Sequence, residues 1–329
     1  MKWSGAKVVV TGAGGFIGSH LCELLVREGA ELTAFVRYTS RGNWGLLDMV
    51  EPDVSQNIQV VTGDLRDPEA VRNVVRGHET IFHLGALIAI PYSYQHPTEV
   101  AQVNVVGTLN VLNAAREFGI SRVLHTSTSE VYGTAQTVPI SESHPLSAQS
   151  PYSASKIGAD ALAMSYHCSF GLPLATVRPF NTYGPRQSGR AVIPTIIGQA
   201  LNAGRVKLGS LTPTRDFLFV KDTVAGFLAV ANCDKTIGKT VNLGTGSEIS
   251  IGDLAAKIVE RTGCDVSIES EEERMRPDNS EVFRLVCDAE RARSWTGWEP
   301  TYSLDAGLDE VIDFMRSHPH WTKSRRYEV

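Results

Sequence analysis

The stretch A-K-V-V-V-T-G-A-G-G-F-I-G occupies residues 6–18 and decides the fold. Its apolar run at 6–10 has the length of a buried strand. The amphipathic pattern at 19–27 predicts a helix, which Gly29 ends. A strand, a glycine-rich turn and a helix N-terminus in this order can hold a pyrophosphate with backbone N–H groups and the helix dipole. We therefore predict a dinucleotide site, rather than a plain turn, at Gly12, Gly15, Phe16, Ile17 and Gly18.

Apolar runs alternate with helical patterns over the first 180 residues. The runs that we interpret as further strands lie at 31–36, 58–62, 80–84, 122–126 and 174–177. This alternation is typical of a doubly wound parallel sheet. The predicted fold class is therefore α/β, with a Rossmann-type sheet.

The pattern changes after residue 180. Residues 217–220 and 241–243 look like a return to the main sheet. Helices and one strand that stand apart from it are predicted at 193–203, 251–262, 266–270 and 304–316. We predict that residues 1–180 and 216–246 form the Rossmann domain. Residues 181–215 and 247–329 are predicted to form a smaller α/β substrate domain over the carboxyl ends of the strands, where open α/β sheets bind ligands.

The end of the second predicted strand bears on which dinucleotide binds. An NAD site usually has an Asp or Glu there, which binds the ribose diol. This chain has Arg37 instead, and Arg41 follows. Either these arginines lie in a solvated basic loop or they face a 2′-phosphate, and the absence of the acid favours the phosphate. The predicted cofactor is therefore NADP, with NAD as the alternative.

Other cofactor contacts are expected where the third and fourth strands end. Asp64 can bond the adenine amino group or cap the next helix. Small residues at 85 and 86 let a cofactor pass close to the backbone. The predicted contacts at these two strand ends are Asp64, Leu65, Leu84 and Ala86. Asn104, in a long helical pattern at 97–118, is interpreted as a buried structural amide.

Two further stretches carry side chains suited to catalysis. L-H-T-S-T-S-E-V-Y-G at 124–133 places Thr128, Ser129 and Glu130 just after the fifth predicted strand. S-P-Y-S-A-S-K at 150–156 holds Tyr152 and Lys156, which share one face if 152–168 is helical. The ammonium group would then lower the pKa of the phenol, and a phenolate is a general base for an alcohol proton. Tyr152 and Lys156 would also contact the cofactor.

Composition excludes several other classes of protein. The chain has 329 residues, 42% of them apolar, and its net charge of −5 comes from dispersed charges. We therefore expect neither a nucleic-acid partner nor a membrane-surface one. The five Cys are scattered, without metal-site spacing, so they are interpreted as reduced thiols and no metal site is predicted. No signal peptide and no apolar run of transmembrane length is evident, so we expect a cytoplasmic protein.

Together the motifs resemble the extended short-chain dehydrogenase/reductase family that acts on nucleotide sugars. They occur in the family's order along nearly the whole chain: T-G-A-G-G-F-I-G at 11–18, G-D-L at 63–65, H-L-G-A at 83–86, Y-S-A-S-K at 152–156, N-T-Y-G-P at 181–185 and R-D-F at 215–217. The resemblance implies a Rossmann domain with a small sugar-nucleotide domain and a nucleotide-sugar substrate. It also implies a homodimer formed through a helix pair that includes the Tyr–Lys helix.

Residues after the fifth strand sort the family's reactions. Thr128-Ser129-Glu130 is similar to dehydratases of the GDP-mannose type, which also use NADP, whereas the thymidine-linked 4,6-dehydratases have Asp where Ser129 stands. UDP-glucuronate decarboxylases share S-T-S-E-V-Y-G but usually lack R-D-F. F-V-R-Y-T-S-R, Y-G-T-A-Q and R-A-V-I-P together resemble the UDP-N-acetylglucosamine 4,6-dehydratases of the legionaminic-acid type.

The resemblance also implies roles for single residues. Tyr152 would take the sugar 4-OH proton, Thr128 would bond O4, and Glu130 would remove the C5 proton and serve as the acid for the departing water. Lys156 would bond the nicotinamide ribose. Four residues would bind the sugar or its diphosphate, although an Asx turn or a surface salt bridge would also explain them: Asn181, Arg186, Arg190 and Arg215. The rival functions are a UDP-glucuronate decarboxylase, a 4-epimerase and a non-catalytic NADP-binding regulator.

Overall fold

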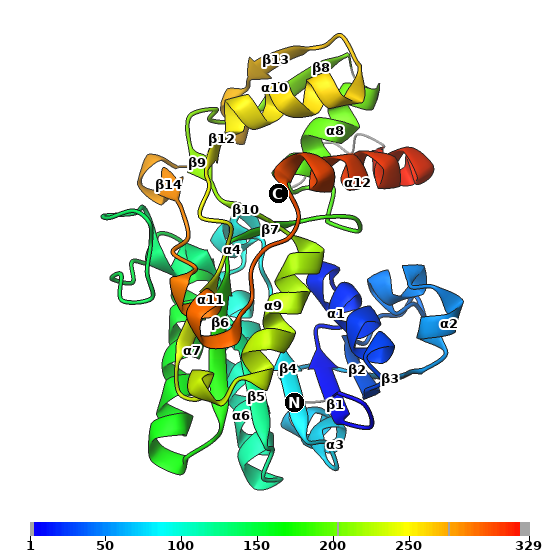
Figure 1. Ribbon diagram of the computed structural model, residues 1–329, viewed down its shortest axis with the longest axis vertical. Coiled ribbons are helices and arrows are strands. Elements are labelled where there is room, and N and C mark those ends of the chain that lie inside the picture. Colours follow the sequence, from blue (N-terminus) through cyan, green and yellow to red (C-terminus); the bar gives the residue numbers. More distant parts are fainter. Residues whose placement is uncertain (1–2, 203, 276, 323–329) are drawn as a thin grey trace.

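A computed structural model describes residues 3–202, 204–275 and 277–322 of the chain. Its centre is a seven-stranded parallel sheet in the order β3–β2–β1–β4–β5–β6–β11 (Figure 1). The strands are β1 (Lys7–Thr11), β2 (Glu31–Arg37), β3 (Ile58–Gly63), β4 (Thr80–His83), β5 (Arg122–Thr126), β6 (Leu174–Pro179) and β11 (Thr240–Leu243). The strand order reverses between β1 and β4, where doubly wound sheets bind ligands. This arrangement confirms the predicted fold class.

Helices cover both faces of this sheet. Those associated with it are α1 (Phe16–Arg27), α2 (Pro52–Ser55), α3 (Pro68–Val75), α4 (Ile90–Gln95), α5 (Pro97–Ala101), α6 (Gly107–Glu117), α7 (Pro151–Phe170), α9 (Val220–Asn232) and α11 (Glu290–Thr296). Helix α1 starts three residues before the predicted position, because the glycine-rich turn already ends at its N-cap, Gly15. The predicted long helix at 97–118 is interrupted by a π-helical turn at Gln102–Val106.

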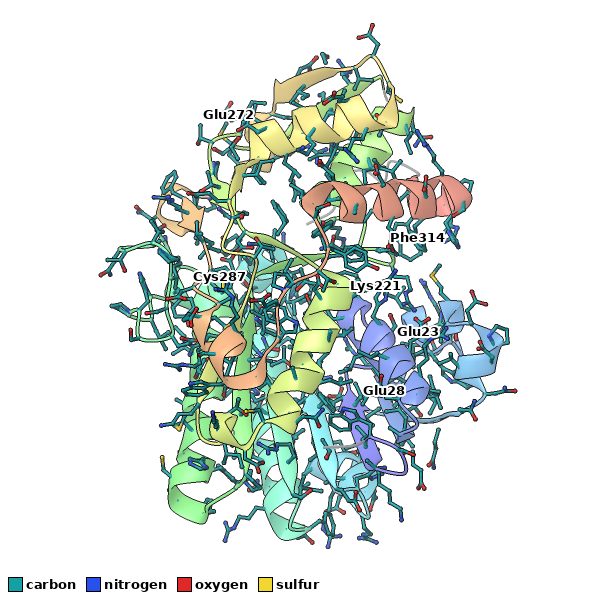
Figure 2. All side chains as sticks on the ribbon, in the orientation of Figure 1. Glu23, Glu28, Lys221, Glu272, Cys287 and Phe314 are labelled. Carbon is teal, nitrogen blue, oxygen red and sulfur yellow. The ribbon has the colours of Figure 1, made fainter. Side chains whose placement is uncertain are left out.

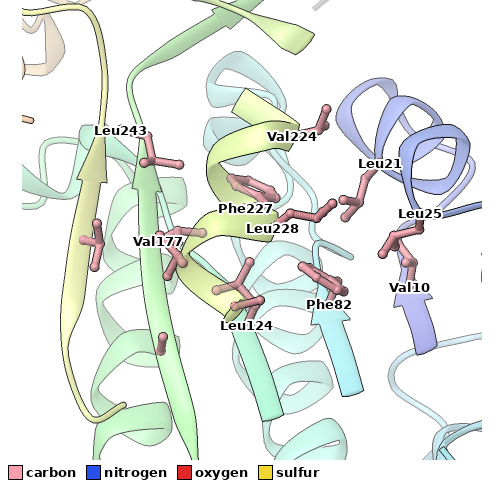
Figure 3. Packing of buried hydrophobic residues seen from close by; sticks show 14 of the residues in the cluster. Val10, Leu21, Leu25, Phe82, Leu124, Val177, Val224, Phe227, Leu228 and Leu243 are labelled. Carbon is pink, nitrogen blue, oxygen red and sulfur yellow. The ribbon is translucent and has the colours of Figure 1, made fainter. Parts of the chain in front are cut away.

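Two hydrophobic clusters fill the space between the sheet and these helices. Val8 and Val10 of β1 belong to the cluster beneath α1 and α9, and Val9 belongs to the cluster beneath α3 and α6. Side chains alternate along a strand, so each strand feeds both faces. Figure 3 shows the first cluster, in which Leu21 and Phe227 lie over the strands. Strands buried on both faces are continuous apolar runs, which is why the sequence revealed them.

A third cluster lies apart, in the group of elements at the top of Figure 1. These elements are β7 (Asn181–Tyr183), α8 (Val192–Asn202), β8 (Arg205–Leu208), β10 (Phe217–Phe219), α10 (Ile251–Thr262), β13 (Ser267–Ser270), α12 (Leu304–Ser317) and α13 (Pro319–Thr322). Position 203, the predicted last residue of α8, lies outside the described residues. We call this group the cap.

One prediction for this region is wrong. Residues 217–220 do not return to the main sheet, since β10 pairs in parallel with β7 in a separate two-stranded sheet. Phe217 and Phe219 belong to the cap cluster, while Leu218 between them belongs to the cluster beneath α1 and α9. The strand thus lies between two cores, and its apolar run could not tell which sheet it would join.

The last part of the chain contributes to both cores. Leu308 and Val311 of α12 pack in the cap, but Cys287, Ala292 and Trp298 belong to the cluster beneath α1 and α9. Helix α11 therefore packs on the Rossmann unit, although it lies within the segment 247–329 that we assigned to the small domain. The described residues hold no helix with the length and apolar character that a membrane crossing needs.

The shorter elements connect these units. A three-stranded sheet runs in the order β12–β9–β14, formed by Ile249–Ser250, Thr214–Arg215 and Arg284–Leu285. Short 3₁₀ turns lie at Gly45–Met49, Ser129–Tyr132, Asp234–Thr236, Glu272–Arg274 and Asp278–Ser280. The turn at Ser129–Tyr132, labelled η3 below, follows β5 and carries Glu130.

Candidate active site

The glycine-rich turn has the shape that the sequence predicts. Gly12 has φ +70°, and a Cβ there would lie 2.7 Å from the backbone N of Gly85 at the end of β4. A Cβ at Gly18 would collide with the carbonyl oxygen of Gly12. No side chain caps the start of α1, which begins at Phe16 and continues through Ile17. Its first N–H groups can therefore receive an anion at the switch point of the sheet.

Asp64, at the end of β3, does not cap the next helix, which was one of its two predicted roles. Its carboxylate binds Arg66, with Nη2 to Oδ2 at 2.6 Å, and this hydrogen bond lowers the pKa of Asp64. Asp67, not Asp64, caps α3 by accepting from the backbone N–H of Glu69. Asp64 thus stays at the strand end with its carboxylate partly exposed.

Arg37 ends β2, as predicted. Its guanidinium is 61% exposed and lies 3.7 Å from the carboxylate of Glu99. Arg41 is exposed in the loop that follows. This loop crosses the glycine-rich turn, since the backbone N–H of Leu46 donates to the carbonyl of Gly14 at 2.9 Å.

Small residues let β4 approach the turn. A Cβ at Gly85 would meet the Cδ1 atom of Leu65 at 2.5 Å, so Leu65 packs directly on this strand end. Leu84 and Ala86 flank Gly85 and are partly exposed. The four predicted contacts at these strand ends therefore lie around one crossing point.

Helix α7 presents the Tyr–Lys pair. Ser150 caps it, and a reciprocal capping box with Ser153 fixes its first turn. Tyr152 and Lys156 lie in the first two turns and are 6% and 4% exposed. The helix begins one residue before the predicted range 152–168 and ends two residues after it. Tyr152 and Lys156 are therefore both helical and share one face of α7.

The residues after β5 meet this helix. The side chain of Thr128 hydrogen-bonds with the Tyr152 phenol, and the Glu130 carboxylate acts on the phenol through its charge. The Thr128 hydroxyl also accepts from the backbone N–H of Glu130 at 3.2 Å, which caps η3. Ser129 is buried, whereas Thr128 and Glu130 are partly exposed. A hydroxyl and a phenol thus meet at the end of β5, and Glu130 lies on the turn that follows.

The predicted lowering of the Tyr152 pKa by Lys156 is wrong. Burial raises the pKa of Tyr152, the charges of Glu130 and Asp160 raise it further, and only the bond with Thr128 opposes them. Lys156 Nζ donates instead to the carbonyl oxygen of Thr126 at 2.7 Å. Burial lowers the pKa of Lys156 to about 8.

Beneath the pair lies a buried polar network that we did not predict. Asp160, one turn beyond Lys156, accepts from Ser127 Oγ at 2.8 Å and from Arg178 Nη2 at 2.9 Å, and His125 Nε2 lies 3.0 Å away. Burial alone would raise the pKa of Asp160, but the bonds and charges of these partners hold it at about 2. The spacing Lys156–Asp160 was the available signal, because i and i+4 share a face.

Asn104 is the buried structural amide that we expected, in an unexpected setting. It lies in the π-helical turn and is 1% exposed. Its Nδ2 donates to the carbonyl of Leu87 and to Ser155 Oγ, each at 2.9 Å, and its Oδ1 accepts from the N–H of Leu87. Asn104 therefore ties the loop after β4 to α7 between Tyr152 and Lys156. π-Helical turns occur frequently at functional sites.

The predicted substrate residues lie in different settings. Asn181 is partly exposed at the start of β7, and its side chain donates to the carbonyl of Asp216 at 3.3 Å. Arg215 is buried, and its guanidinium lies 3.2 Å from Glu281. Arg190 is exposed. Asn181 pairs with Phe217 of β10, so it lies beside the segment that carries Arg215 two residues earlier.

Arg186 lies in a setting that the sequence did not indicate. It has φ +68° and is 5% exposed, and its Nη2 lies 2.8 Å from Glu23 and 2.6 Å from His20. Both partners belong to α1, and Figure 2 labels Glu23 on this helix. The guanidinium of Arg186 is thus already paired with α1, and its predicted contact with the sugar diphosphate stays a prediction. It joins the N-T-Y-G-P-R segment to the helix that starts at the glycine-rich turn.

The residues fit a nicotinamide dinucleotide. The uncapped start of α1, the close crossing of Gly12 and Gly85, and Lys156 beside the β5 end lie along the switch point of one sheet. The described residues hold no cluster of His, Cys, Asp and Glu that could bind a metal ion.

The sequence is similar to those of known proteins along nearly its whole length. A family model described as GDP-mannose 4,6 dehydratase matches residues 9–311. A UDP-glucose 4-epimerase of Mycolicibacterium smegmatis is 34% identical over 317 residues, or 94% of this chain and 99% of the relative. A dTDP-glucose 4,6-dehydratase of Streptomyces griseus is 33% identical over 320 residues, or 95% of each chain.

A solved structure extends the likeness to three dimensions. A double mutant of dTDP-glucose 4,6-dehydratase from Streptomyces venezuelae, with NAD bound, is 29% identical and gives a TM-score of 0.88 over 96% of this chain and 98% of that one. The match covers both the sheet and the cap. The chain therefore belongs to the GDP-mannose 4,6-dehydratase family of extended short-chain dehydrogenases/reductases, whose members are nucleotide-sugar dehydratases and epimerases.

Proposed function

We propose that this protein is a nucleotide-sugar 4,6-dehydratase that converts UDP-N-acetylglucosamine to its 4-keto-6-deoxy product. The observation that carries the proposal is Glu130 on η3, the turn capped by Thr128, whose side chain bonds the Tyr152 phenol. A dehydratase needs a base at C5 in addition to the base at the 4-OH, and this motif supplies one. The three short motifs that resemble legionaminic-acid-type enzymes support the UDP-N-acetylglucosamine substrate.

The proposed reaction has two stages that use different residues. Tyr152, as phenolate, takes the 4-OH proton while Thr128 bonds O4. A nicotinamide bound here would accept the C4 hydride, return it to C6, and bring the positive charge that favours the phenolate. Once C4 is a ketone, the C5 proton is acidic, and Glu130 removes it. Glu130 then gives a proton to the departing C6 hydroxyl, and a proton returns to C5. No net oxidation occurs.

The remaining residues are assigned to binding. Gly12, Gly15, Gly18, Phe16 and Ile17 would hold the pyrophosphate, and Lys156 would bond the nicotinamide ribose. Contacts with the adenosine end are proposed for Asp64, Leu65, Leu84 and Ala86. The sugar diphosphate is assigned to Asn181 and Arg215, with exposed Arg190 as a further candidate. Arg215 would exchange its contact with Glu281 for the diphosphate, which suits a bidentate guanidinium.

We propose NADP as the preferred cofactor. Arg37 ends β2 where NAD sites usually have an acid, and both Arg37 and Arg41 are exposed enough to reach a 2′-phosphate. The Streptomyces venezuelae relative was solved with NAD, which supports the alternative. Binding of NAD and NADP to the wild type and to Arg37→Ala separates the two, because only NADP should lose affinity when the guanidinium is removed.

We also propose a homodimer and a separate substrate domain. Phe170 ends α7, the Tyr–Lys helix that the resemblance places in the helix pair, and is 49% exposed. Val106, at the end of the π-helical turn, is 44% exposed. The cap has its own core, which supports a substrate unit built from 181–215 and parts of 247–329. Sedimentation of the purified protein tests the dimer.

A 4-epimerase is the second candidate, because an epimerase is among the relatives at similar identity. An epimerase oxidises and reduces C4 but needs no base at C5. Glu130 therefore separates the two functions. A UDP-glucuronate decarboxylase would instead release CO₂ from C6.

Glu130→Gln tests the proposal. The wild type should give the 4-keto-6-deoxy sugar without net formation of reduced nicotinamide, and the variant should lose that product by roughly a hundredfold to ten-thousandfold. Glu117→Gln is the matched control, since Glu117 pairs with Arg72 on an exposed surface. Product formation by Glu130→Gln near the wild-type rate would show that the role given to Glu130 is wrong.

A further inference from the structure

Arg178 makes contacts that the proposed reaction does not use. It lies on β6, is 5% exposed, and spans two neighbouring elements. Its Nη2 donates to Asp160 on α7 at 2.9 Å, and its Nη1 donates to the Tyr132 hydroxyl at 2.9 Å. The guanidinium also lies over the Tyr132 ring, 4.9 Å from its centroid. One buried side chain therefore touches both catalytic segments.

Each contact lies close in sequence to a proposed catalytic group. Asp160 is one helical turn beyond Lys156, and Tyr132 is two residues beyond Glu130 at the end of η3. The other end of the same segment is fixed as well, because Ser127 Oγ, beside Thr128, donates to Asp160 at 2.8 Å. The segment 127–132 is thus attached at both ends to polar groups organised by α7.

The Tyr132 hydroxyl completes the link on its far side. It donates to Asn242 Oδ1 on β11 at 2.8 Å, and Asn242 Nδ2 donates to the carbonyl of Ile140 at 3.1 Å. Asn242 and Tyr132 are fully buried. A buried hydroxyl that both donates and accepts fixes its ring in position, since losing either bond leaves a polar group unpaired.

We propose that Arg178, acting through Tyr132 and Asp160, is a positioning residue that sets the place of Glu130 relative to Tyr152 and Lys156. We call the link Asp160–Arg178–Tyr132 the bridge. The proposal rests on the function proposed above, because the bridge serves the C5 step, in which Glu130 is the base. It places two reactive groups on different elements at one fixed separation, and small errors in such placement reduce rates strongly. The C4 step depends on Tyr152, Thr128 and Lys156, which keep their own contacts when only the Tyr132 end is cut.

Tyr132→Phe cuts the bridge at the Glu130 end and also removes the bond to Asn242. It keeps the ring under the guanidinium and leaves the Arg178–Asp160 pair in place. Tyr166→Phe is the matched control: Tyr166 is a buried tyrosine on α7 whose hydroxyl donates to Asn113 Oδ1, away from the segment 127–132. Arg178→Lys is the second variant, because a lysine can hold Asp160 but cannot reach Tyr132 at the same time. Thermal unfolding and cofactor binding verify that each variant folds.

The two stages are measured separately in a single turnover of the cofactor-loaded enzyme with UDP-N-acetylglucosamine in heavy water. Absorbance of reduced nicotinamide reports the C4 step, and deuterium at C5 of the recovered sugar reports the Glu130 step. In Tyr132→Phe and Arg178→Lys we expect reduced nicotinamide to form at nearly the wild-type rate and C5 exchange to fall by roughly tenfold to a hundredfold. Reduced nicotinamide should therefore accumulate, and Tyr166→Phe should behave as wild type.

An equal fall in both stages, or no fall in either, would overturn the positioning role. A wild type without C5 exchange would instead overturn the proposed function. Amide hydrogen exchange then decides on the bridge without reference to the reaction. Peptides covering 127–133 should exchange faster in Tyr132→Phe than in the wild type, and peptides covering α7 should not. Unchanged exchange at 127–133 would overturn the bridge.

Discussion

Burial decides the protonation of Tyr152. The helix spacing placed the lysine correctly, but spacing says nothing about how deeply a phenol lies or which carboxylates face it. Glu130 and Asp160 both raise the pKa of Tyr152, and they come from segments far apart in sequence. The Asp160 network escaped prediction for the same reason, since Ser127, His125 and Arg178 meet it only in the folded chain.

The Thr128 hydroxyl opposes the rise in the pKa of Tyr152, so removing it should change how the reaction rate depends on pH. In Thr128→Val the pKa of Tyr152 should rise further, and less phenolate should exist at any given pH. The acidic limb of kcat/KM against pH should therefore shift to higher pH. Thr262→Val is the control, because the Thr262 hydroxyl bonds the Val259 carbonyl in α10 of the cap, away from the site. An unshifted limb in Thr128→Val would contradict the part given to this hydroxyl.

Among the elements, α1 and α7 position the site through the structure of their N-termini. The sequence predicted α1 and the parallel strands, because buried strands are continuous apolar runs and the glycines mark a helix start. For α7 it offered only the Tyr–Lys spacing, which fits a helix over 152–168. It did not predict the partner of β10, since an apolar run of three residues fits either core. It also missed the π-helical turn at Asn104, which has no pattern of its own.

Gly18→Ala should disable the cofactor turn. The added methyl group would collide with the Gly12 carbonyl, which has no room to move because Gly12 itself meets Gly85. We expect cofactor affinity, measured by fluorescence titration, to fall by more than tenfold, at a cost of roughly 1.4 kcal/mol or more. Gly252→Ala is the control, since its methyl group meets Leu211 at an ordinary 3.5 Å. Tight cofactor binding by Gly18→Ala would contradict the turn's role.

Ser150→Ala should loosen the first turn of α7. The substitution removes the capping box with Ser153, which costs about 1 kcal/mol of stability. Because Tyr152 lies in that turn, kcat should fall more than the stability loss alone explains. Chemical denaturation and steady-state rates measure both effects. Unchanged rates in a variant with the expected loss of stability would show that the cap does not position Tyr152.

In the whole molecule, Arg186 joins the start of the cap to α1. Its contacts with Glu23 and His20 cross between segments that the sequence treats as separate domains. The division into Rossmann and substrate units was visible in the change of pattern after residue 180. The return of α11 and Trp298 to the first core was not, because amphipathic patterns show that a face is buried but not against what.

Because His20 lies in this contact between Arg186 and α1, we expect the stability of the protein to depend on pH. Burial, followed by the charge of Arg186, lowers the pKa of His20 from 6.5 to about 4. The unfolded chain therefore binds more protons between these values, and the contribution is full above pH 6.5 and is lost as pH falls toward 4. Lowering the pH from 7 to 5 should therefore reduce the contribution of His20 to the free energy of unfolding by about 2 kcal/mol.

Removing the titrating group should reduce that dependence. In His20→Gln the unfolding free energy should fall less between pH 7 and pH 5 than in the wild type, as measured by urea unfolding at each pH. His83 and His125 are also buried with lowered pKa values, so some dependence should remain. An identical slope in His20→Gln and the wild type would contradict the assignment.

The most direct test of the proposed dehydratase is the fate of the sugar in heavy water. The wild-type protein, loaded with NADP or NAD, is incubated with UDP-N-acetylglucosamine and with other UDP-, GDP- and dTDP-hexoses, and the products are analysed by mass spectrometry and NMR. We predict a 4-keto-6-deoxy product that has lost one water and carries one deuterium at C5, with the cofactor unchanged at the end. A sugar inverted at C4 that keeps all its oxygen atoms and has no deuterium at C5 would contradict the dehydratase and support an epimerase.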